Sequence, residues 1–390
     1  MYQQPRSTIE GFAKMRYSEF GKTGKMVSAI GFGGMRFDLD KSPEANADLL
    51  KYAFDSGINY FDTAPGYCSD KSEELFGLGF KNIPRDKYFV ATKLGPAHVA
   101  NELEAYEKVK KSIERMGVGY IDFFYVWCIR RMANFELAMN NGLYDALLKC
   151  KAEGLIKHIC FSSHQEGAGV RKIVETGLFE GVLLGVNILN FPYRWDGILA
   201  AEEHGLGVVA MNPLAGGLIP KNEDKLQFLA SPGETPTEAA LRFLVANPNI
   251  TVALNGFTTR EHIDTACRVA DAEPMTAEDI ARIKTHISGN MTRICTACGY
   301  CEECPENIPI PAYMQIYNDK AVFGKTDDEM ISSMKFLHEW GLLVEPRGSA
   351  AACIACGRCE ESCTQHLDII DRLREVAEWE AKSQDINKAK

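Results

Sequence analysis

Long apolar runs are missing from this 390-residue sequence. A membrane-spanning helix needs ~18 or more uncharged apolar residues, and no stretch of the chain approaches that length. Residues 1–16 are polar and contain no apolar core of the kind found in a secretory signal peptide. We therefore expect a soluble, cytoplasmic protein that does not associate with membranes.

An excess of positive charge is also missing. The chain has 43 Lys and Arg residues against 53 Asp and Glu residues, which gives a net charge of −10. Non-specific binding of nucleic acid needs a basic face, so nucleic acid is not an expected partner. Hydrophobic residues make up 46% of the chain, which is ordinary for a globular protein and excludes wholesale disorder.

The thirteen cysteines are unevenly distributed. Eight lie between Cys295 and Cys363, and the other five are scattered over the first 294 residues: Cys68, Cys128, Cys150, Cys160 and Cys267. In a reducing compartment a dense cysteine cluster is more typical of metal binding than of disulfides. The change in composition near 288–293 predicts an N-terminal tail over 1–14, a large domain over 15–287, a small domain over 288–379 and a polar, fraying tail over 380–390.

The large domain alternates short apolar runs with longer amphipathic stretches. The runs expected to be strands cover 28–33, 60–62, 88–92, 121–126, 158–162, 182–187, 207–211 and 251–255, and the clearest helices are expected at 101–116, 136–153 and 237–246. Eight strands, each followed by a helix pattern, predict an α/β fold of the (β/α)₈ TIM barrel type. Residues 15–24 are expected to form one arm and the turn of a hairpin that closes the bottom of the barrel. An open, doubly wound sheet is the competing fold, but no G-x-G-x-x-G follows the first strand.

The small domain contains two cysteine runs of nearly equal spacing. They are Cys295-x₂-Cys298-x₂-Cys301-x₂-Cys304 and Cys353-x₂-Cys356-x₂-Cys359-x₃-Cys363. A C-x₂-C-x₂-C run can place three thiolates on three irons of a [4Fe–4S] cubane, and in two-cluster ferredoxins the fourth cysteine of each run ligates the other cluster. By that rule one cluster is assigned to Cys295, Cys298, Cys301 and Cys363, and the second to Cys304, Cys353, Cys356 and Cys359. We therefore expect a smaller, α-helical, ferredoxin-like iron–sulfur domain, with zinc ribbons as the alternative.

Polar residues follow two successive strands of the large domain. Asp62 ends the second expected strand, Tyr67 follows shortly after, and Lys93 ends the third. The C-terminal ends of barrel strands carry the chemistry of TIM-barrel enzymes. A buried ammonium is expected to lower the pKa of the tyrosine, which could then protonate a carbonyl oxygen while hydride reaches the carbon. Taken singly, Asp62 also fits a helix cap, Tyr67 a rim aromatic and Lys93 a solvated strand end.

These segments resemble the aldo-keto reductases over about residues 14–286. The resemblance also rests on Gly31-Phe32-Gly33-Gly34-Met35, Tyr120-Ile121-Asp122-Phe123-Phe124 and Met211-Asn212-Pro213-Leu214-Ala215-Gly216-Gly217. With the cysteine runs, the whole chain is similar to a bacterial subgroup in which such a reductase is fused to a ferredoxin-type domain. The resemblance implies a TIM barrel that binds NADP(H) and acts on a small carbonyl or alcohol substrate.

The catalytic histidine of the family is absent from its usual position. That histidine lies five residues after the aspartate of the fourth strand, where this chain has Trp127. An indole can donate a hydrogen bond but cannot carry a proton, and Trp127 also fits simple packing of the pocket wall. His164, after the fifth strand, is a possible substitute. Two other functions stay open: proton abstraction at the same site, giving elimination or isomerisation, and a nucleotide-binding subunit for electron transfer or regulation.

The cofactor positions of the family are only partly matched. Those implied by the resemblance are Ser162, Asn187, Met211, Pro213, Leu214, Gly216, Gly256, Phe257, Thr258 and Arg260. The glutamine usual just before Asn187 is missing, whereas the helix that opens at Arg260 offers its N-terminus to a phosphate. Cubanes pass single electrons and nicotinamide passes hydride, so their coupling would need a mediator such as flavin, for which no sequence signature is present. An external redox protein is a further expected partner.

Overall fold

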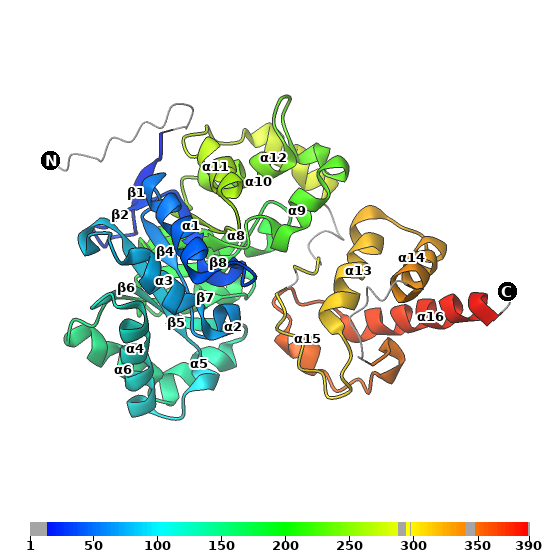
Figure 1. Cartoon of the computed structure of the whole chain (residues 1–390), viewed down its shortest axis with the longest axis horizontal. Helices are drawn as coiled ribbons and strands as arrows, with labels where there is room; N and C mark the ends of the chain where they lie inside the picture. The colour runs from blue at the N-terminus through cyan, green and yellow to red at the C-terminus, as the bar shows by residue number, and fades with distance from the viewer. Residues whose placement is uncertain (1–13, 288–293, 297, 340–347, 389–390) are drawn as a thin grey trace. The chain divides into compact units, whose positions relative to one another are not determined.

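The computed structural model describes residues 14–287, 294–296, 298–339 and 348–388 (Figure 1). The expected N-terminal tail, apart from Lys14, and the boundary expected at 288–293 lie outside these described residues. No helix in the described part of the chain is both long enough and apolar enough to cross a membrane.

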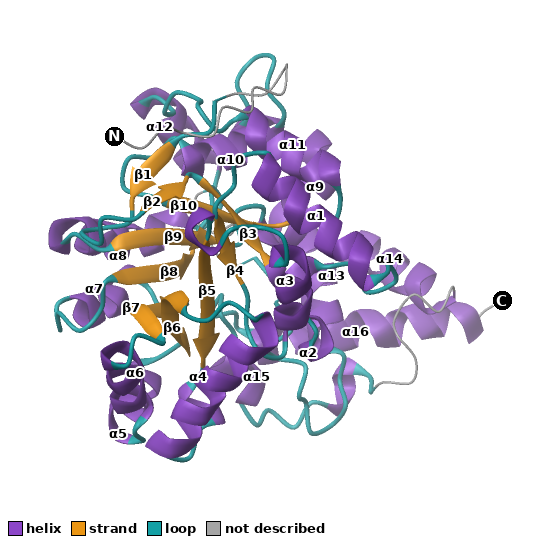
Figure 2. Cartoon of the chain, turned by 60° about the vertical axis from the view of Figure 1, so that its left-hand side comes forward, coloured by secondary structure: helices purple, strands orange, loops and turns teal. Residues whose placement is uncertain are grey.

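The large domain is a closed barrel of eight parallel strands. In chain order they are β3 (Ile30–Gly33), β4 (Tyr60–Asp62), β5 (Phe89–Leu94), β6 (Ile121–Ile129), β7 (Ile156–Ser163), β8 (Gly181–Gly185), β9 (Gly207–Met211) and β10 (Val252–Gly256). The ring is closed by parallel pairing of β10 with β3. Figure 2 shows the strands at the centre with helices outside them. The predicted TIM barrel is confirmed.

A hairpin closes the N-terminal end of the barrel. Strands β1 (Tyr17–Glu19) and β2 (Met26–Ser28) pair antiparallel, and Phe20 between them is fully buried. The Phe20 ring packs 4.1 Å from the ring of Phe123 and 6.2 Å from that of Tyr60. A Cβ at Gly207 would lie 2.3 Å from the Phe20 ring, so glycine there makes room for the plug.

Alternation along the strands decides which side chains reach the barrel mouth. Tyr60, Tyr125, Cys160 and Leu183 belong to one buried cluster inside the barrel, and the hydroxyls of Tyr60 and Tyr125 lie 2.7 Å apart. Because side chains alternate inward and outward, the residue two positions further along each strand faces inward one layer higher. Asp62 on β4, Ser162 on β7 and Gly185 on β8 are therefore directed toward the C-terminal end.

Helices follow the strands around the barrel. Their bounds are α1 (Pro43–Asp55), α2 (Tyr67–Asp70), α3 (Ser72–Phe80), α4 (Glu102–Met116), α5 (Met132–Asn140), α6 (Leu143–Ala152), α7 (Gly167–Val174), α8 (Phe191–His204), α10 (Pro236–Val245) and α11 (Arg260–Arg268). The single helix expected over 136–153 is wrong, because the chain breaks it into α5 and α6. Gly142 has φ 84°, and a Cβ there would lie 2.6 Å from the Glu102 nitrogen, so the chain turns where only glycine fits.

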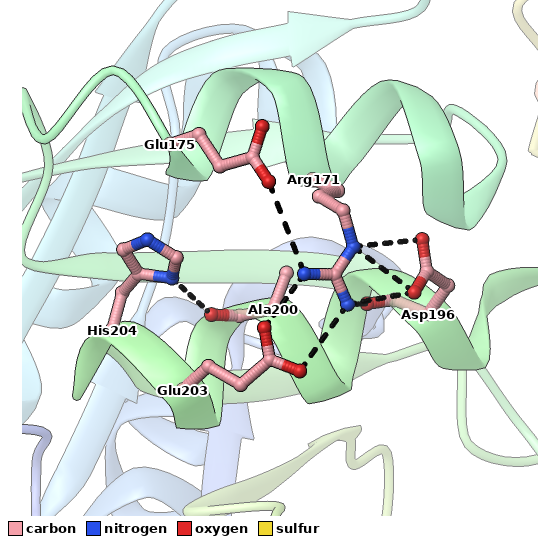
Figure 3. A network of polar contacts seen from close by, with 6 residues as sticks. All are labelled: Arg171, Glu175, Asp196, Ala200, Glu203 and His204. Atoms are coloured by element: carbon pink, nitrogen blue, oxygen red, sulfur yellow. Dashed lines mark hydrogen bonds and ion pairs between the residues drawn. The ribbon is translucent and has the colours of Figure 1, made fainter.

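A charged network joins helices α7 and α8 on the outside of the barrel (Figure 3). Arg171 contacts Asp196 at 2.7 Å, Glu203 at 2.6 Å and Glu175 at 3.9 Å. Hydrogen bonds to the Arg171 guanidinium lower the pKa of Asp196 and of Glu203. The network lies at the surface, and its ion pairs connect the two helices.

The chain divides into two compact units. One comprises residues 1–214 and 229–280, and the second comprises 215–228 and 281–390. The second unit contains α9 (Leu218–Lys221), the end of α12 (Ala277–His286), α13 (Ile310–Phe323), α14 (Asp327–Glu339), α15 (Arg358–Ser362) and α16 (Ile369–Lys388). Its buried core includes Met314, Met330, Leu373 and Trp379. This division places residues 215–228, which follow β9, with the cysteine runs, whereas the sequence had been expected to divide only near 288.

The polar tail expected from residue 380 onward is wrong at its start. Helix α16 continues to Lys388, and Glu380 within it is buried. Its carboxylate accepts hydrogen bonds from the Ser349 hydroxyl at 2.7 Å, from the Ala350 nitrogen at 2.9 Å and from the Tyr313 hydroxyl. Composition alone makes this segment look solvated, but these long-range donors satisfy the carboxylate inside the unit.

Candidate active site and cluster cavities

Asp62 and Lys93 form a buried ion pair at the ends of two neighbouring strands. Lys93 Nζ lies 2.5 Å from Asp62 Oδ1 and donates to the Thr63 carbonyl at 2.7 Å. Both side chains are almost fully buried. Burial raises the pKa of Asp62 and lowers the pKa of Lys93, although their mutual attraction opposes both shifts. Asp62 Oδ2 has no hydrogen-bond partner among the described residues, so this buried oxygen can still accept a hydrogen bond.

Tyr67 stands over this pair. Its ring centroid lies 5.0 Å from Lys93 Nζ, so the ammonium contacts the face of the ring. Burial raises the pKa of Tyr67 well above its ordinary value, and the Asp62 carboxylate raises it further. The expectation that the ammonium lowers this pKa is wrong, because burial and then the Asp62 carboxylate raise it. The phenol is therefore protonated at neutral pH.

The turn that carries Tyr67 has an uncommon backbone. Three consecutive residues without glycine's freedom, Cys68, Ser69 and Asp70, have φ of 53°, 54° and 65°. Such residues adopt left-handed φ only at a cost, of roughly 1–3 kcal/mol each. The Asp70 carboxylate offsets part of it by accepting from the Gly66 nitrogen at 2.9 Å.

Arg115 on α4 ties this turn to the strand that carries Lys93. Its Nη1 lies 3.0 Å from Asp70 Oδ1 and 3.4 Å from Glu73 Oε2, and its Nη2 donates to the Asp70 carbonyl. Glu73 is fully buried and accepts at 2.9 Å from the hydroxyl of Thr92, the neighbour of Lys93. Sequence reasoning missed Arg115, because nothing local links it to a turn 45 residues earlier.

Trp127 lies beside Tyr67, at an irregularity of β6. Pairing with β7 shifts register between Val126 and Ile129, and Cys128 has φ 60°. A bulge of this kind re-aims side chains at a strand end. The Trp127 ring packs edge-on at 5.6 Å from the Tyr67 ring and 6.2 Å from the ring of His98. His98, an exposed histidine missed by the sequence reasoning, is thus the histidine whose ring contacts Trp127.

His164, the expected substitute histidine, is buried at the end of β7 beside Gly185. A Cβ at Gly185 would lie 3.1 Å from His164 Nδ1 and 2.6 Å from Arg194 Nη1. Arg194, on α8, is itself fully buried and donates to the Gly185 carbonyl. Gly185 lies just before Asn187, in the segment that lacks the family glutamine, and the side chains of His164 and Arg194 fill the space there.

Ser162 and Asn187 differ in what they offer to a nicotinamide carboxamide. Ser162 is fully buried, and its hydroxyl has no hydrogen-bond partner among the described residues. The Asn187 side chain is engaged: its Oδ1 accepts from the Leu189 nitrogen at 2.9 Å and its Nδ2 donates to the Asn212 carbonyl at 3.1 Å. Ser162 therefore fits an incoming amide better than Asn187 does.

Basic side chains gather where β10 leads into α11. The Thr259 hydroxyl caps the helix, and Lys41 Nζ donates to the Thr258 carbonyl at 3.0 Å. His262 Nδ1 lies 3.0 Å from the Thr258 hydroxyl, and the exposed Arg260 lies 4.8 Å from the ring of Tyr52. A helix N-terminus with such neighbours suits a nucleotide phosphate. Of the neighbouring expected positions, Gly256 is exposed and Phe257 is buried.

The remaining expected cofactor positions follow β9. Met211 ends the strand, Pro213 is buried, and Leu214 and Gly216 are partly exposed. The backbone between them is left-handed at several points, with φ of 64° at Asn212, 51° at Ala215 and 70° at Gly216.

The eight clustered cysteines line two separate cavities in the second unit. A cavity of ≈ 350 Å³ is lined by Cys304, Cys353, Cys356 and Cys359, together with Ile308, Ile354 and Leu373 among others. A cavity of ≈ 320 Å³ is lined by Cys295, Cys298, Cys301 and Cys363, together with Met314 and Leu367 among others. These are the two sets that the crossed assignment predicts. Among the described residues, no group of three or more acidic, histidine or cysteine side chains is arranged as a site for a single metal ion. A [4Fe–4S] cubane is larger than one ion, and its four thiolates each bind a different iron.

Several local features suit these cavities to a cubane. Burial raises the pKa of Cys301, with neighbouring thiols adding to the shift, and raises that of Cys359 to about 11. Bound iron would remove these protons, because the thiolate is the ligand. Gly299 and Gly357 have φ of 80° and 79°, which lets the chain wrap each cavity closely.

The closed ring of eight parallel strands, with Asp62 and Lys93 at strand ends and Tyr67 beside them, is a TIM barrel. The sequence profile of the aldo/keto reductase family matches residues 29–288, and that of a 4Fe-4S dicluster domain matches 294–370. The chain belongs to the aldo/keto reductase family and carries a 4Fe-4S dicluster domain after the barrel, which confirms the predicted fusion.

Several known proteins are similar to this chain. The L-galactose dehydrogenase of Arabidopsis thaliana is 28% identical over 285 residues, covering 64% of this chain and 86% of that protein. The D-threo-aldose 1-dehydrogenase of a Pseudomonas species is 29% identical over 247 residues, covering 55% and 74%. The solved structure of an aldo-keto reductase from Bacillus halodurans in its holo form has a TM-score of 0.60 at 24% identity, covering 70% of this chain and 96% of that one. That last similarity supports the fold alone.

Proposed function

We propose that this oxidoreductase interconverts a small carbonyl compound and its alcohol with NADP(H), at a site built from Asp62, Tyr67 and Lys93. The observation that carries the proposal is the buried Lys93–Asp62 ion pair with the half-buried Tyr67 ring against it, at the mouth of an aldo/keto reductase barrel.

Tyr67 is the proton donor in the proposed reaction. The nicotinamide, when bound, supplies hydride to the carbonyl carbon. The phenol gives its proton to the carbonyl oxygen, which becomes strongly basic as hydride arrives. Its raised pKa keeps the phenol protonated at neutral pH, which is the form that the reduction needs. Asp62 fixes Lys93 against the ring, and Trp127 supplies a flat wall beside the reacting carbonyl.

The residues present fit the nucleotide at two points. The unpartnered hydroxyl of Ser162 would hold the carboxamide, and Lys41, Arg260 and His262 at α11 would hold a phosphate. Met211, Pro213, Leu214 and Gly216 would line the cofactor from the loop after β9, and Phe257 would support it from the next loop. Asn187 is the poorer match, because its amide is already bonded within the chain.

The two cysteine-lined cavities are the proposed sites of two [4Fe–4S] clusters. Each cavity offers four sulfurs from two distant parts of the sequence, which suits the crossed ligation of a dicluster domain. The clusters would either accept single electrons from an external redox protein or hold the second unit together. Coupling them to hydride chemistry would need a bound flavin as a mediator.

The test of the proposed reaction is Tyr67→Phe. The variant keeps the ring against Lys93 and removes the only proposed proton donor, so turnover should fall about 10²–10⁴-fold. Nucleotide binding, followed by fluorescence of the four tryptophans, should be unchanged. Retention of full activity would contradict the mechanism.

Metal content tests the cluster assignment. Anaerobic reconstitution should give iron and sulfide in the proportion of two cubanes per chain, with the broad visible absorbance of such clusters. Zinc in place of iron would support the zinc-ribbon alternative.

A nucleotide-binding subunit without turnover is the second candidate, and it is favoured by Trp127, which stands where the family has its catalytic histidine and packs against the Tyr67 ring. Tight nucleotide binding with no turnover of any carbonyl in the wild-type chain would support it. The third candidate is proton abstraction by Tyr67 and Lys93, and the raised pKa of Tyr67 makes the phenolate that would act as the base scarce at neutral pH.

A further inference from the structure

The loop after β9 belongs structurally to the iron–sulfur unit. Residues 215–228 group with 281–390, although they precede α10 of the barrel in sequence. Lys225 Nζ lies 4.2 Å from the ring of Phe323 on α13. Phe228 stacks at 4.9 Å on the ring of His286, and its carbonyl accepts from Arg282. The far end of the segment is therefore anchored on α12 and α13.

The near end of the segment is held by the first cysteine run. A Cβ at Gly216 would lie 2.0 Å from the carbonyl oxygen of Thr296 and 2.8 Å from its carbonyl carbon. Real Cβ atoms do not approach backbone so closely, so the two backbones touch only because residue 216 is glycine. Gly217 is also left-handed, at φ 94°, but a Cβ there would meet nothing within 4 Å. Close packing is thus specific to Gly216.

Thr296 is fixed by its position in the cluster loop. It is buried and lies next to Cys295, one of the four cysteines of the ≈ 320 Å³ cavity, which it also lines. The backbone of Cys295 is clamped by Asn318: its nitrogen donates to Asn318 Oδ1 at 2.9 Å, and its carbonyl accepts from Asn318 Nδ2 at 2.8 Å. Any change in how the cavity is filled therefore reaches Thr296 through one peptide unit.

We propose that Thr296 is a positioning residue for the loop after β9. Binding of a cluster by Cys295, Cys298, Cys301 and Cys363 and binding of the nucleotide are then coupled through this loop. The inference rests on the proposed function, which assigns Pro213, Leu214 and Gly216 to the nucleotide. With a cluster in place, Thr296 holds Gly216 in its left-handed conformation. Without it, the four thiols no longer tether the loop, and the nucleotide must order the segment itself.

The coupling has a reciprocal consequence. If the cluster tightens nucleotide binding by some factor, the nucleotide must stabilise the bound cluster by the same factor, because both describe one thermodynamic cycle. We expect this factor to be about tenfold, within the usual range for coupled sites. The cavity of Cys304, Cys353, Cys356 and Cys359 does not include Thr296, so its occupancy should matter much less.

The test compares nucleotide affinity in chains that differ only in their clusters. The dissociation constant for NADPH is measured by tryptophan fluorescence in reconstituted wild type, in Cys298→Ser and in Cys356→Ser, the last two altering one cavity each. Cys298→Ser should weaken binding about tenfold, whereas Cys356→Ser should stay within twofold of wild type. Iron release to a chelator, followed by loss of visible absorbance, should be slower with saturating NADPH by a similar factor.

Gly216→Ala and Gly217→Ala provide the matched pair. Both place a side chain at positive φ, but only Gly216→Ala meets Thr296. Gly216→Ala should lose both NADPH affinity and the protection of iron by NADPH, and Gly217→Ala should keep both. Comparison of the thermal midpoints of the two variants separates this effect from general loss of stability.

The outcomes distinguish the two levels of the argument. Equal NADPH affinity in wild type and Cys298→Ser, or equal losses in the two glycine variants, overturns the coupling and leaves the proposed function standing. Failure of fully reconstituted wild type to bind NADPH at all overturns the proposed function and the coupling with it.

Discussion

The protonation state of the Tyr67 phenol depends on how the charge of Lys93 is balanced by its neighbours. A free ammonium beside a phenol stabilises the phenolate, but here Asp62 neutralises that ammonium at 2.5 Å, and burial then dominates. The hydroxyl of Tyr67 makes no hydrogen bond to any described residue, so its proton is available to a substrate. A phenol held in this form is a proton donor over a wide range of pH.

The pH profiles of the two reaction directions should therefore differ. The phenol's pKa is above its usual value of about 10, so kcat/KM for carbonyl reduction should stay level from neutral pH up to about 10 and fall only beyond it. Alcohol oxidation needs the phenolate and should rise throughout the same interval. The measurement is kcat/KM against pH in both directions, with Tyr67→Phe as the control. A fall in reduction near neutral pH would show that the ammonium acidifies the phenol after all.

Removal of one partner of the buried ion pair should destabilise the barrel. Asp62→Asn leaves the Lys93 ammonium almost fully buried without its carboxylate, which typically lowers the free energy of unfolding by about 3–5 kcal/mol. Urea unfolding measures this change. The double variant Asp62→Asn, Lys93→Met removes both charges and should recover part of the loss. A double variant less stable than Asp62→Asn would contradict this assignment.

Part of the candidate site was predictable from the sequence, because its residues lie at strand ends. The features that depend on long-range contacts were not predictable. Asp62, Tyr67 and Lys93 were expected together because parallel strands of a barrel end at one face. The direction of the Tyr67 pKa shift was not predictable, because it depends on which neighbouring group forms an ion pair with Lys93. Nothing in the sequence around Asn187 shows that its amide is already bonded to Leu189 and Asn212.

At the scale of the element, the short α2 turn decides where Tyr67 points. The left-handed conformation of this turn is stabilised by the Asp70 carboxylate, which accepts hydrogen bonds from the Gly66 nitrogen and from Arg115. Those hydrogen bonds lower the pKa of Asp70 and keep its carboxylate charged. The clamp continues through Glu73 to Thr92 on β5, so the elements that carry Tyr67 and Lys93 share one polar network.

Arg115→Gln should therefore act on catalysis more than on binding. Loss of the clamp lets the turn relax, and a displacement of about 1 Å at the reacting group can lower kcat about 100-fold, while KM should change little. Steady-state kinetics measure both constants. Lys110→Gln, on the same helix but at a partly exposed lysine that pairs only with Glu107 among the described acidic side chains, is the matched control. Equal effects of the two variants would show that Arg115 is not a positioning residue.

Local signals were enough to place the barrel strands but not every helix. All eight strands occur where apolar runs indicate them, because burial on both faces leaves a continuous apolar signature. The helix pattern over 136–153 carries no local sign that the chain turns at Gly142, where the nearby backbone of Glu102 requires glycine. The break is a tertiary effect, which periodicity does not report.

At the scale of the whole molecule, the composition of the chain and its structural division agree only in part. The cysteine-rich region predicts a second domain, and residues 281–390 form most of one. Membership of residues 215–228 in the same unit depends on Gly216, Lys225 and Phe228 meeting residues far along the chain. No composition shift marks that segment, so the sequence analysis assigned it to the barrel domain.

The second unit should depend on its clusters far more than the barrel does. Its apolar core is packed against partly buried cysteines of both cavities, including Cys295, Cys304 and Cys353, so loss of iron leaves apolar space within that core. The barrel core contains none of these cysteines. Hydrogen exchange before and after chelation should thus show large losses of protection in α13 and α16, and unchanged protection in the barrel strands.

Residues 215–228 decide how this prediction is judged. Because they pack within the second unit, their amides should lose protection together with α13, although α10, which follows them in sequence, should stay protected. Chelator already saturated with metal is the control for direct effects of the reagent. Protection of residues 215–228 that follows the barrel, or loss of protection in β4 and β5 on chelation, would show that the boundary between the two units lies elsewhere.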